Sequence, residues 1–218
     1  MTKVPAQVDA GAKRPQSSAD DAIEEWFDAE GTWFAGLPQH GYVLERDDGD
    51  RALFSYDVGG ATKASVVVSN SGAGDDARWV VDAWAMCDPA EFPAAMTDEL
   101  GLQIWEDAAG NRVAQSVVAS HRGAEHCDWQ DITFLRVGGD LSSSPQFVSD
   151  DGGALAGQLL TSYDGSAALP PDAVDTGFRR EGRQLWLAAD RSAAYLVSIE
   201  DPADVQRWPR ARRPIMCA

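Results

Sequence analysis

The stretch GYVLERDDGDRALFSYDVGGATKASVVVSNSGAGDDARWVVDAWAMC, residues 41 to 87, decides the fold of the first part of this chain. Its apolar and β-branched runs are interrupted at Asp48-Gly49, at Gly59-Gly60 and at residues 72–76. Asp-Gly and Gly-Gly pairs are typical of tight turns between antiparallel strands, because these residues accept the positive φ that such turns require. The stretch therefore predicts a meander of three or four antiparallel strands.

Upstream of the meander, the pattern SSADDAIEEWFDAEG, residues 17 to 31, predicts one amphipathic helix. A serine at its start, acidic side chains in its first turn and a glycine at its end are helix start and stop signals. Ile23, Trp26 and Phe27 fall on one face of this helix. A helix followed by a meander favours an α+β layer in which the apolar helix face packs against the strands.

Beyond this layer, the sequence predicts a second part, residues 101–218, that is rich in β-hairpins. The stretches 101–105 and 182–186 both read G-x-Q-aliphatic-Trp, and a further strand pattern follows each of them. An arginine-rich strap, RWPRARRP at residues 207–214, comes near the end. The predicted fold class is therefore α+β, mainly antiparallel β, with an N-terminal helix packed on a β-meander in residues 18–100 and a second, hairpin-rich part.

The charge of the chain limits its partners. At −17, with 35 acidic and 18 basic side chains, the chain repels phosphate backbones, so nucleic acid is not an expected partner. No run approaches the ~20 apolar residues of a membrane span, and direct membrane insertion is not expected. Residues 1–17 are polar and contain Pro, Ala and Ser, which predicts a disordered linker behind a signal or anchor. A cytoplasmic protein is expected instead if Met1 is the true start.

Two histidines and one cysteine fall within seven positions of HRGAEHCDWQDITFLRV, residues 121 to 137. A zinc site at His121, His126 and Cys127 would need these side chains to converge on one ion. The spacing fits no zinc motif, and adjacent side chains point in opposite directions along an extended backbone. No metal and no cofactor are therefore predicted. Acidic neighbours disfavour the thiolate form of Cys127, which argues against a catalytic nucleophile.

The cysteines favour a structural role. Cys87 ends a predicted strand and Cys127 precedes one, so a disulfide between them is the favoured prediction. Cys217, next to the end of the chain, is the alternative partner for Cys127. Three cysteines leave one thiol over.

Four stretches of the sequence resemble an actinobacterial family of uncharacterised exported proteins. They are CDPAEF (87–92), EHCDWQDITFL (125–135), LPPDAVDTGFRREGRQLWLAADRSAAYLV (169–197) and WPRARRPIMCA (208–218). The resemblance spans most of residues 40–218 and brings no assigned activity or site residues. It implies an extracytoplasmic domain, secreted or held at the cell envelope, and hence an oxidising compartment in which disulfides persist.

No short catalytic signature is present, so the sequence predicts a non-enzymatic extracytoplasmic binding or interaction domain, whose partner is an unknown protein or small ligand. Two alternatives remain open. One is a hydrolase that uses carboxylates or His126 in a cleft between the two parts, and the other is a structural spacer module. Nothing in the sequence indicates an oligomeric state.

Tryptophans are the candidate ligand-binding residues. Trp33 and Trp208 have glycine, proline or charged neighbours and are expected on the surface, where they would contact a ligand. Four others alternate with apolar neighbours and are expected in the core: Trp79, Trp84, Trp105 and Trp186.

Overall fold

A computed structural model describes residues 18–30, 37–72, 77–138 and 145–216 of the chain. The chain divides into two compact units between Met86 and Cys87, whereas the sequence suggested a boundary near residue 100. Both units are built mainly from antiparallel sheets, with few helices, which confirms the predicted α+β class. The predicted linker, residues 1–17, lies outside the described residues.

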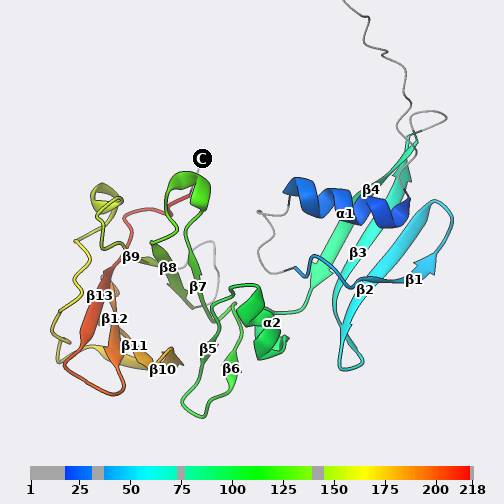
Figure 1. Cartoon of the computed structure of the whole chain (residues 1–218). Helices are drawn as coiled ribbons and strands as arrows, with labels where there is room; N and C mark the ends of the chain where they lie inside the picture. Colours follow the sequence, from blue (N-terminus) through cyan, green and yellow to red (C-terminus); the bar gives the residue numbers. More distant parts are fainter. Residues whose placement is uncertain (1–17, 31–36, 73–76, 139–144, 217–218) are drawn as a thin grey trace, which may run out of the picture. The chain divides into compact units, whose positions relative to one another are not determined.

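The first unit is a four-stranded antiparallel sheet with a helix across one face (Figure 1). Its elements are α1 (Ala19–Glu30), β1 (Val43–Asp47), β2 (Arg51–Val58), β3 (Ala61–Ser71) and β4 (Arg78–Met86). The strands lie in chain order, so the predicted meander is confirmed with four strands. Gly49, Gly59 and Gly60 all have positive φ, as the tight turns on either side of β2 require.

Ser18 and Asp21 cap the start of helix α1. The Asp21 N–H donates to Ser18 Oγ at 3.1 Å, and the Asp21 carboxylate accepts the Ser18 N–H at 2.8 Å. This reciprocal arrangement satisfies two backbone donors at the helix start. Ile23 and Phe27 are buried in one cluster with Phe54 of β2 and other residues of the sheet, so the predicted packing of the helix on the meander is confirmed.

The second unit contains two sheets (Figure 1). The larger has the strand order β13-β12-β11-β10-β5-β6, and the smaller has the order β7-β8-β9. Its helical elements are η2 (Pro89–Glu91), α2 (Ala94–Glu99), η3 (Glu125–Cys127) and η4 (Ala156–Gln158). Its strands are β5 (Trp105–Glu106), β6 (Arg112–Val113), β7 (Val118–Arg122), β8 (Thr133–Val137), β9 (Gln146–Ser149), β10 (Val174–Arg180), β11 (Arg183–Leu187), β12 (Ala193–Ser198) and β13 (Val205–Pro209).

Two isolated bridges join these sheets into a closed arrangement. Gln103, just before β5, pairs with Ser120 of β7, and Phe147 of β9 pairs with Arg210, just after β13. The strands therefore follow one another as β5, β10, β11, β12, β13, β9, β8 and β7, and then return to the segment before β5. We call this arrangement the strand ring. It completes the hairpin-rich second part that the sequence predicted.

The interior of the strand ring is a hydrophobic core to which seven of its eight strands contribute buried side chains. Its buried members are Trp105, Val118, Leu135, Val137, Phe147, Leu185, Leu187, Ala194, Leu196 and Trp208. Leu135 pairs with Ser120 and Leu185 pairs with Leu196, and antiparallel partners point to the same side of a sheet. The register thus identifies which side chains on each strand face inward.

The arginine-rich strap is anchored to this unit rather than only solvated. The Ala211 N–H donates to the Gln146 carbonyl at 2.7 Å, and the Ile215 N–H donates to Gln146 Oε1 at 2.9 Å. Ala211 and Ile215 join a buried cluster with Phe134 and Val148, which lie on the outer faces of β8 and β9. The strap thus covers a second, smaller core.

Candidate functional site

The inward-facing side chains of the strand ring change from apolar to polar towards one end. Arg122, the last residue of β7, pairs with Thr133, the first residue of β8. Arg183, the first residue of β11, pairs with Ser198, the last of β12. The polar inward positions at this end are Ser120, Arg122, Thr133, Ser149, Arg183, Ser198 and Gln206. Packed hydrophobic side chains therefore give way to side chains that can bind polar groups.

A hollow of about 630 Å³, which we call the larger hollow, opens at this end of the ring. Trp105, Leu196 and Trp208 contribute its apolar lining. Arg122, Arg180 and Arg183 contribute positive charge from three different strands. Most of its lining is polar, and a concavity of this size that combines apolar side chains with convergent polar groups can hold a small molecule.

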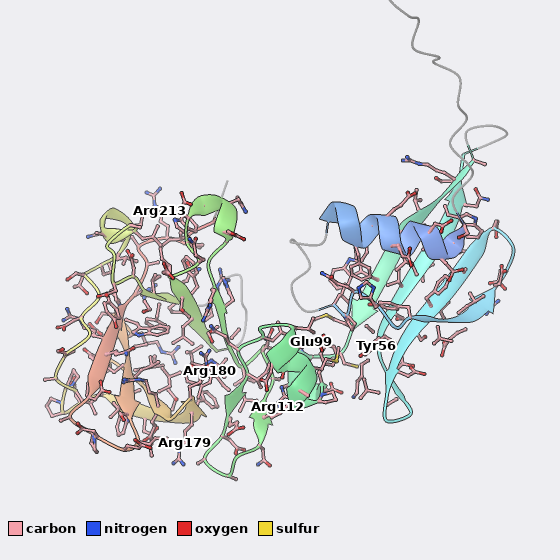
Figure 2. The ribbon with its side chains drawn as sticks, in the orientation of Figure 1. Tyr56, Glu99, Arg112, Arg179, Arg180 and Arg213 are labelled. Carbon is pink, nitrogen blue, oxygen red and sulfur yellow. The ribbon has the colours of Figure 1, made fainter. Side chains whose placement is uncertain are left out.

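A second hollow of about 350 Å³ adjoins it, and the two share Asp98, Leu102, Gln103, Arg180 and Glu181. We call it the smaller hollow. Arg112 and Arg179 also line it (Figure 2). Arg112 is already engaged, because it donates to the Phe92 carbonyl and, at 2.8 Å, to Thr97 Oγ1. These contacts connect β6 to α2, so we assign Arg112 a structural role.

Arg180 is held between the two hollows by three kinds of contact. Its guanidinium lies 5.8 Å from the centre of the Trp105 ring, and Nη1 donates to Ser120 Oγ at 3.2 Å. Nη2 forms an ion pair with the Glu181 carboxylate at 2.8 Å. Trp105 Nε1 donates to the same Ser120 oxygen at 2.9 Å, so Ser120 connects the ring wall to Arg180. The position of this guanidinium is therefore largely fixed.

The turn between β10 and β11 places two arginines opposite each other. Arg180 pairs with Arg183, and the two turn residues, Glu181 and Gly182, have φ of 49° and 72°. Positive φ at both central positions defines the tight turn that suits antiparallel strands. Like charges directly opposite each other repel. Here each has a partner, because Arg183 donates to Asp204 Oδ2 at 2.6 Å while Arg180 pairs with Glu181.

Arg122 and Asp98 differ from these paired groups. Both are exposed and both line the larger hollow. Within the part of the chain that the structure describes, neither side chain has an ion-pair partner within 4.0 Å. The rim of the larger hollow therefore carries one unpaired positive and one unpaired negative charge.

Some of the tryptophan positions that the sequence predicted are confirmed, and others are wrong. Trp208 was expected on the surface, but this prediction is wrong, because its side chain is only 7 % exposed. Trp208 pairs with Ala194 of β12, which faces inward, so the indole ring also points into the strand ring. Its ring nevertheless borders the larger hollow. Trp33 lies outside the described residues. Trp105 is buried as expected, whereas Trp84 is 42 % exposed and its expected core position is wrong, since it lies on the edge strand β4.

His121, His126 and Cys127 lie at or beyond the end of β7. His121 stacks on Phe134 with ring centres 5.4 Å apart, and its Nδ1 lies 2.9 Å from the Arg122 carbonyl. His126 is exposed in η3, next to Cys127. Throughout the described ranges, no three His, Cys, Asp or Glu side chains are grouped so that they could hold a metal ion. His121 therefore has a local packing role against Phe134.

The favoured disulfide between Cys87 and Cys127 is wrong, because Cys87 forms no disulfide in the structure. The alternative pairing of Cys127 with Cys217 stays a prediction. Cys87 is the first residue of the second unit, and Cys217 lies outside the described residues. Trp129, two residues after Cys127, packs against the cluster that contains Ile215, two residues before Cys217. Trp129 and Ile215 thus belong to the surroundings of one cluster, which favours Cys217 over Cys87 as the partner of Cys127.

The groups with displaced pKa values do not line either hollow. Burial raises the pKa of the phenols of Tyr42, Tyr163 and Tyr195. Hydrogen bonds lower the pKa of three carboxylates, those of Asp21, Asp107 and Asp190, which organise local turns or helix starts. None of these shifts indicates a general acid or base.

Sequence reasoning missed the arginines of the hollows. Residues 87–218 contain eleven arginines and no lysine, although the chain as a whole is strongly acidic. Arginine is preferred over lysine where a planar, two-pronged contact to a carboxylate or phosphate is needed. This preference for arginine could have indicated a site that binds an anion, but it does not identify which arginines lie close together in the fold.

No protein-family model, curated protein or solved structure matches the chain. None of the helices in the described ranges is long and apolar enough to cross a membrane. A function must therefore be argued from the geometry of the hollows.

Proposed function

We propose that the protein is a non-enzymatic binding domain whose larger hollow holds a small ligand that bears a carboxylate. The observation that supports this most strongly is the convergence of Arg122, Arg180 and Arg183 on one concave surface of a chain with a charge of −17. An arginine fork matches both oxygens of a carboxylate, and such charge-assisted hydrogen bonds are about twice as strong as neutral ones. Trp105, Leu196 and Trp208 would contact the apolar body of the same ligand.

Binding fits these residues better than hydrolysis. A serine nucleophile needs a neighbouring base that takes its proton. The buried hydroxyl oxygen of Ser120 accepts hydrogen bonds from Trp105 and Arg180, and neither of these groups can act as a base. His126, the base considered from the sequence, is exposed in η3 and does not line either hollow.

The extracytoplasmic location is part of the proposal. It rests on the resemblance to exported actinobacterial proteins, and a disulfide at Cys127 would fit the oxidising environment of such a location. The ligand would then be a small molecule available at the cell envelope or outside the cell.

Calorimetric titration with a matched pair of probes tests the proposed function. N-acetyl-L-leucine has a carboxylate, whereas N-acetyl-L-leucinamide has a neutral amide at the same position. We expect the acid to bind and the amide to bind at least about tenfold more weakly, which corresponds to roughly 1.4 kcal/mol. Equal binding of acid and amide, or no binding of the acid, would overturn the proposal.

A matched pair of variants locates the binding. Arg122→Gln removes an exposed charge at the rim and should weaken binding of N-acetyl-L-leucine by about threefold to tenfold. Arg213→Gln is the control, because Arg213 is also an exposed arginine but lies away from Arg180 (Figure 2). An equal loss in both variants would mean that only the overall charge matters and that the hollow is not the site.

A further inference from the structure

In the part of the chain that the structure describes, the larger hollow carries two unpaired charges of opposite sign, and a simple anion could pair with only one of them. Arg180 is paired with Glu181, and Arg183 is paired with Asp204. The charges at the rim that remain unpaired within the described residues are Arg122 and Asp98. A carboxylate ligand bound at Arg122 would leave the Asp98 carboxylate unpaired and would add a second negative charge near it.

We propose that the ligand is a zwitterion, a free α-amino acid with an apolar side chain. This inference rests on the proposed function and names the ligand class of the same hollow. The ligand carboxylate pairs with Arg122, while its ammonium group pairs with Asp98, so both charges of the rim gain a partner. Both side chains line the larger hollow, and within the described residues they do not form an ion pair with each other.

The remaining lining of the larger hollow fits the side chain of such a ligand. Leu196 and Trp208 face inward and belong to the core of the strand ring, and Trp105 lies beneath the Arg180 guanidinium. Apolar contact with these residues would stabilise an aliphatic side chain by removing its surface from water. A polar amino acid would forgo this contribution, so leucine is a better probe than serine.

The contribution of Asp98 to binding should be modest. Asp98 and Arg122 are both exposed, and water weakens ion pairs between exposed groups. We therefore expect a preference of about threefold to fivefold for a ligand with a free ammonium group over one without it, measured at low ionic strength. Added salt should reduce this preference.

Calorimetric titration with L-leucine and N-acetyl-L-leucine tests the inference. The two probes share the carboxylate and the side chain, but acetylation removes the ammonium charge. The unmodified protein should bind L-leucine about threefold to fivefold more tightly than N-acetyl-L-leucine. Asp98→Asn should abolish this preference and leave the affinity for N-acetyl-L-leucine equal or higher.

Glu99→Gln is the matched control, because Glu99 is the next residue of α2 and is also exposed, yet it does not line either hollow (Figure 2). This variant should keep the preference for L-leucine. If both variants lose the preference equally, or if L-leucine binds no more tightly than N-acetyl-L-leucine, the zwitterion inference is overturned while carboxylate binding stands. If neither probe binds, the proposed function fails together with the inference.

Discussion

Replacing Ser120 with alanine should destabilise the strand ring, because it leaves the buried indole N–H of Trp105 without a hydrogen-bond acceptor. Ser120 is 4 % exposed, and Trp105, whose indole N–H it accepts at 2.9 Å, is 1 % exposed. In Ser120→Ala the Trp105 N–H loses its acceptor in a site that excludes water. Leaving a buried donor unsatisfied costs about 1–3 kcal/mol, and the lost contact to Arg180 adds to this. We expect a total of about 2 kcal/mol.

Urea unfolding followed by far-ultraviolet circular dichroism measures this cost. The Trp105→Phe variant and the double variant complete a thermodynamic cycle, because the hydrogen bond between the two side chains can be lost only once. The double variant should therefore cost about 1 kcal/mol less than the sum of the single variants. A loss below about 0.5 kcal/mol for Ser120→Ala, or strictly additive costs, would refute the reasoning.

Three further predictions concern the core, the acidic turns and the cysteines. Leu185→Ala should lower the free energy of unfolding by about 2–5 kcal/mol, whereas Val174→Ala should change it by less than about 0.5 kcal/mol, because these side chains are 0 % and 57 % exposed; urea unfolding of both variants checks this. The pKa of Asp107 is lowered by hydrogen bonds, first of all from Asn111, so this carboxylate stabilises the fold above its ordinary pKa of 3.8, and the stabilisation is lost as the pH falls through the lower folded value. Asp107→Asn should accordingly unfold at less urea near pH 6 and should show a flatter pH dependence in acid. Thiol titration of the unfolded, unreduced protein should find one thiol per chain, because Cys127 is expected to be oxidised; three thiols would exclude a disulfide.

The first unit was predictable because its signals are local. Turn pairs such as Asp48-Gly49 and Gly59-Gly60 mark the ends of neighbouring strands, and each strand pairs with the next along the chain. The closure of the strand ring was not predictable in this way. It depends on two bridges between distant segments, Gln103 with Ser120 and Phe147 with Arg210, and neither pairing leaves a local pattern.

The candidate site was missed for a related reason. Arg180 and Arg183 are close in sequence, but Arg122 joins them only because β7 and the β10–β11 turn end at the same side of the ring. The errors for Trp84 and Trp208 have the same origin. Alternation identifies the two faces of a strand, but it does not say whether the strand lies at a sheet edge or which face becomes enclosed.

The binding of a carboxylate in the larger hollow can be tested most directly through the indole N–H groups of the eight tryptophans. In a proton–nitrogen correlation spectrum, each indole gives its own signal, which substitution with phenylalanine assigns. Addition of N-acetyl-L-leucine should shift the signals of Trp105 and Trp208, which line the larger hollow, and leave those of Trp79 and Trp186, which do not. Unchanged Trp105 and Trp208 signals at saturating probe, or equal shifts of all four, would contradict a ligand site in this hollow.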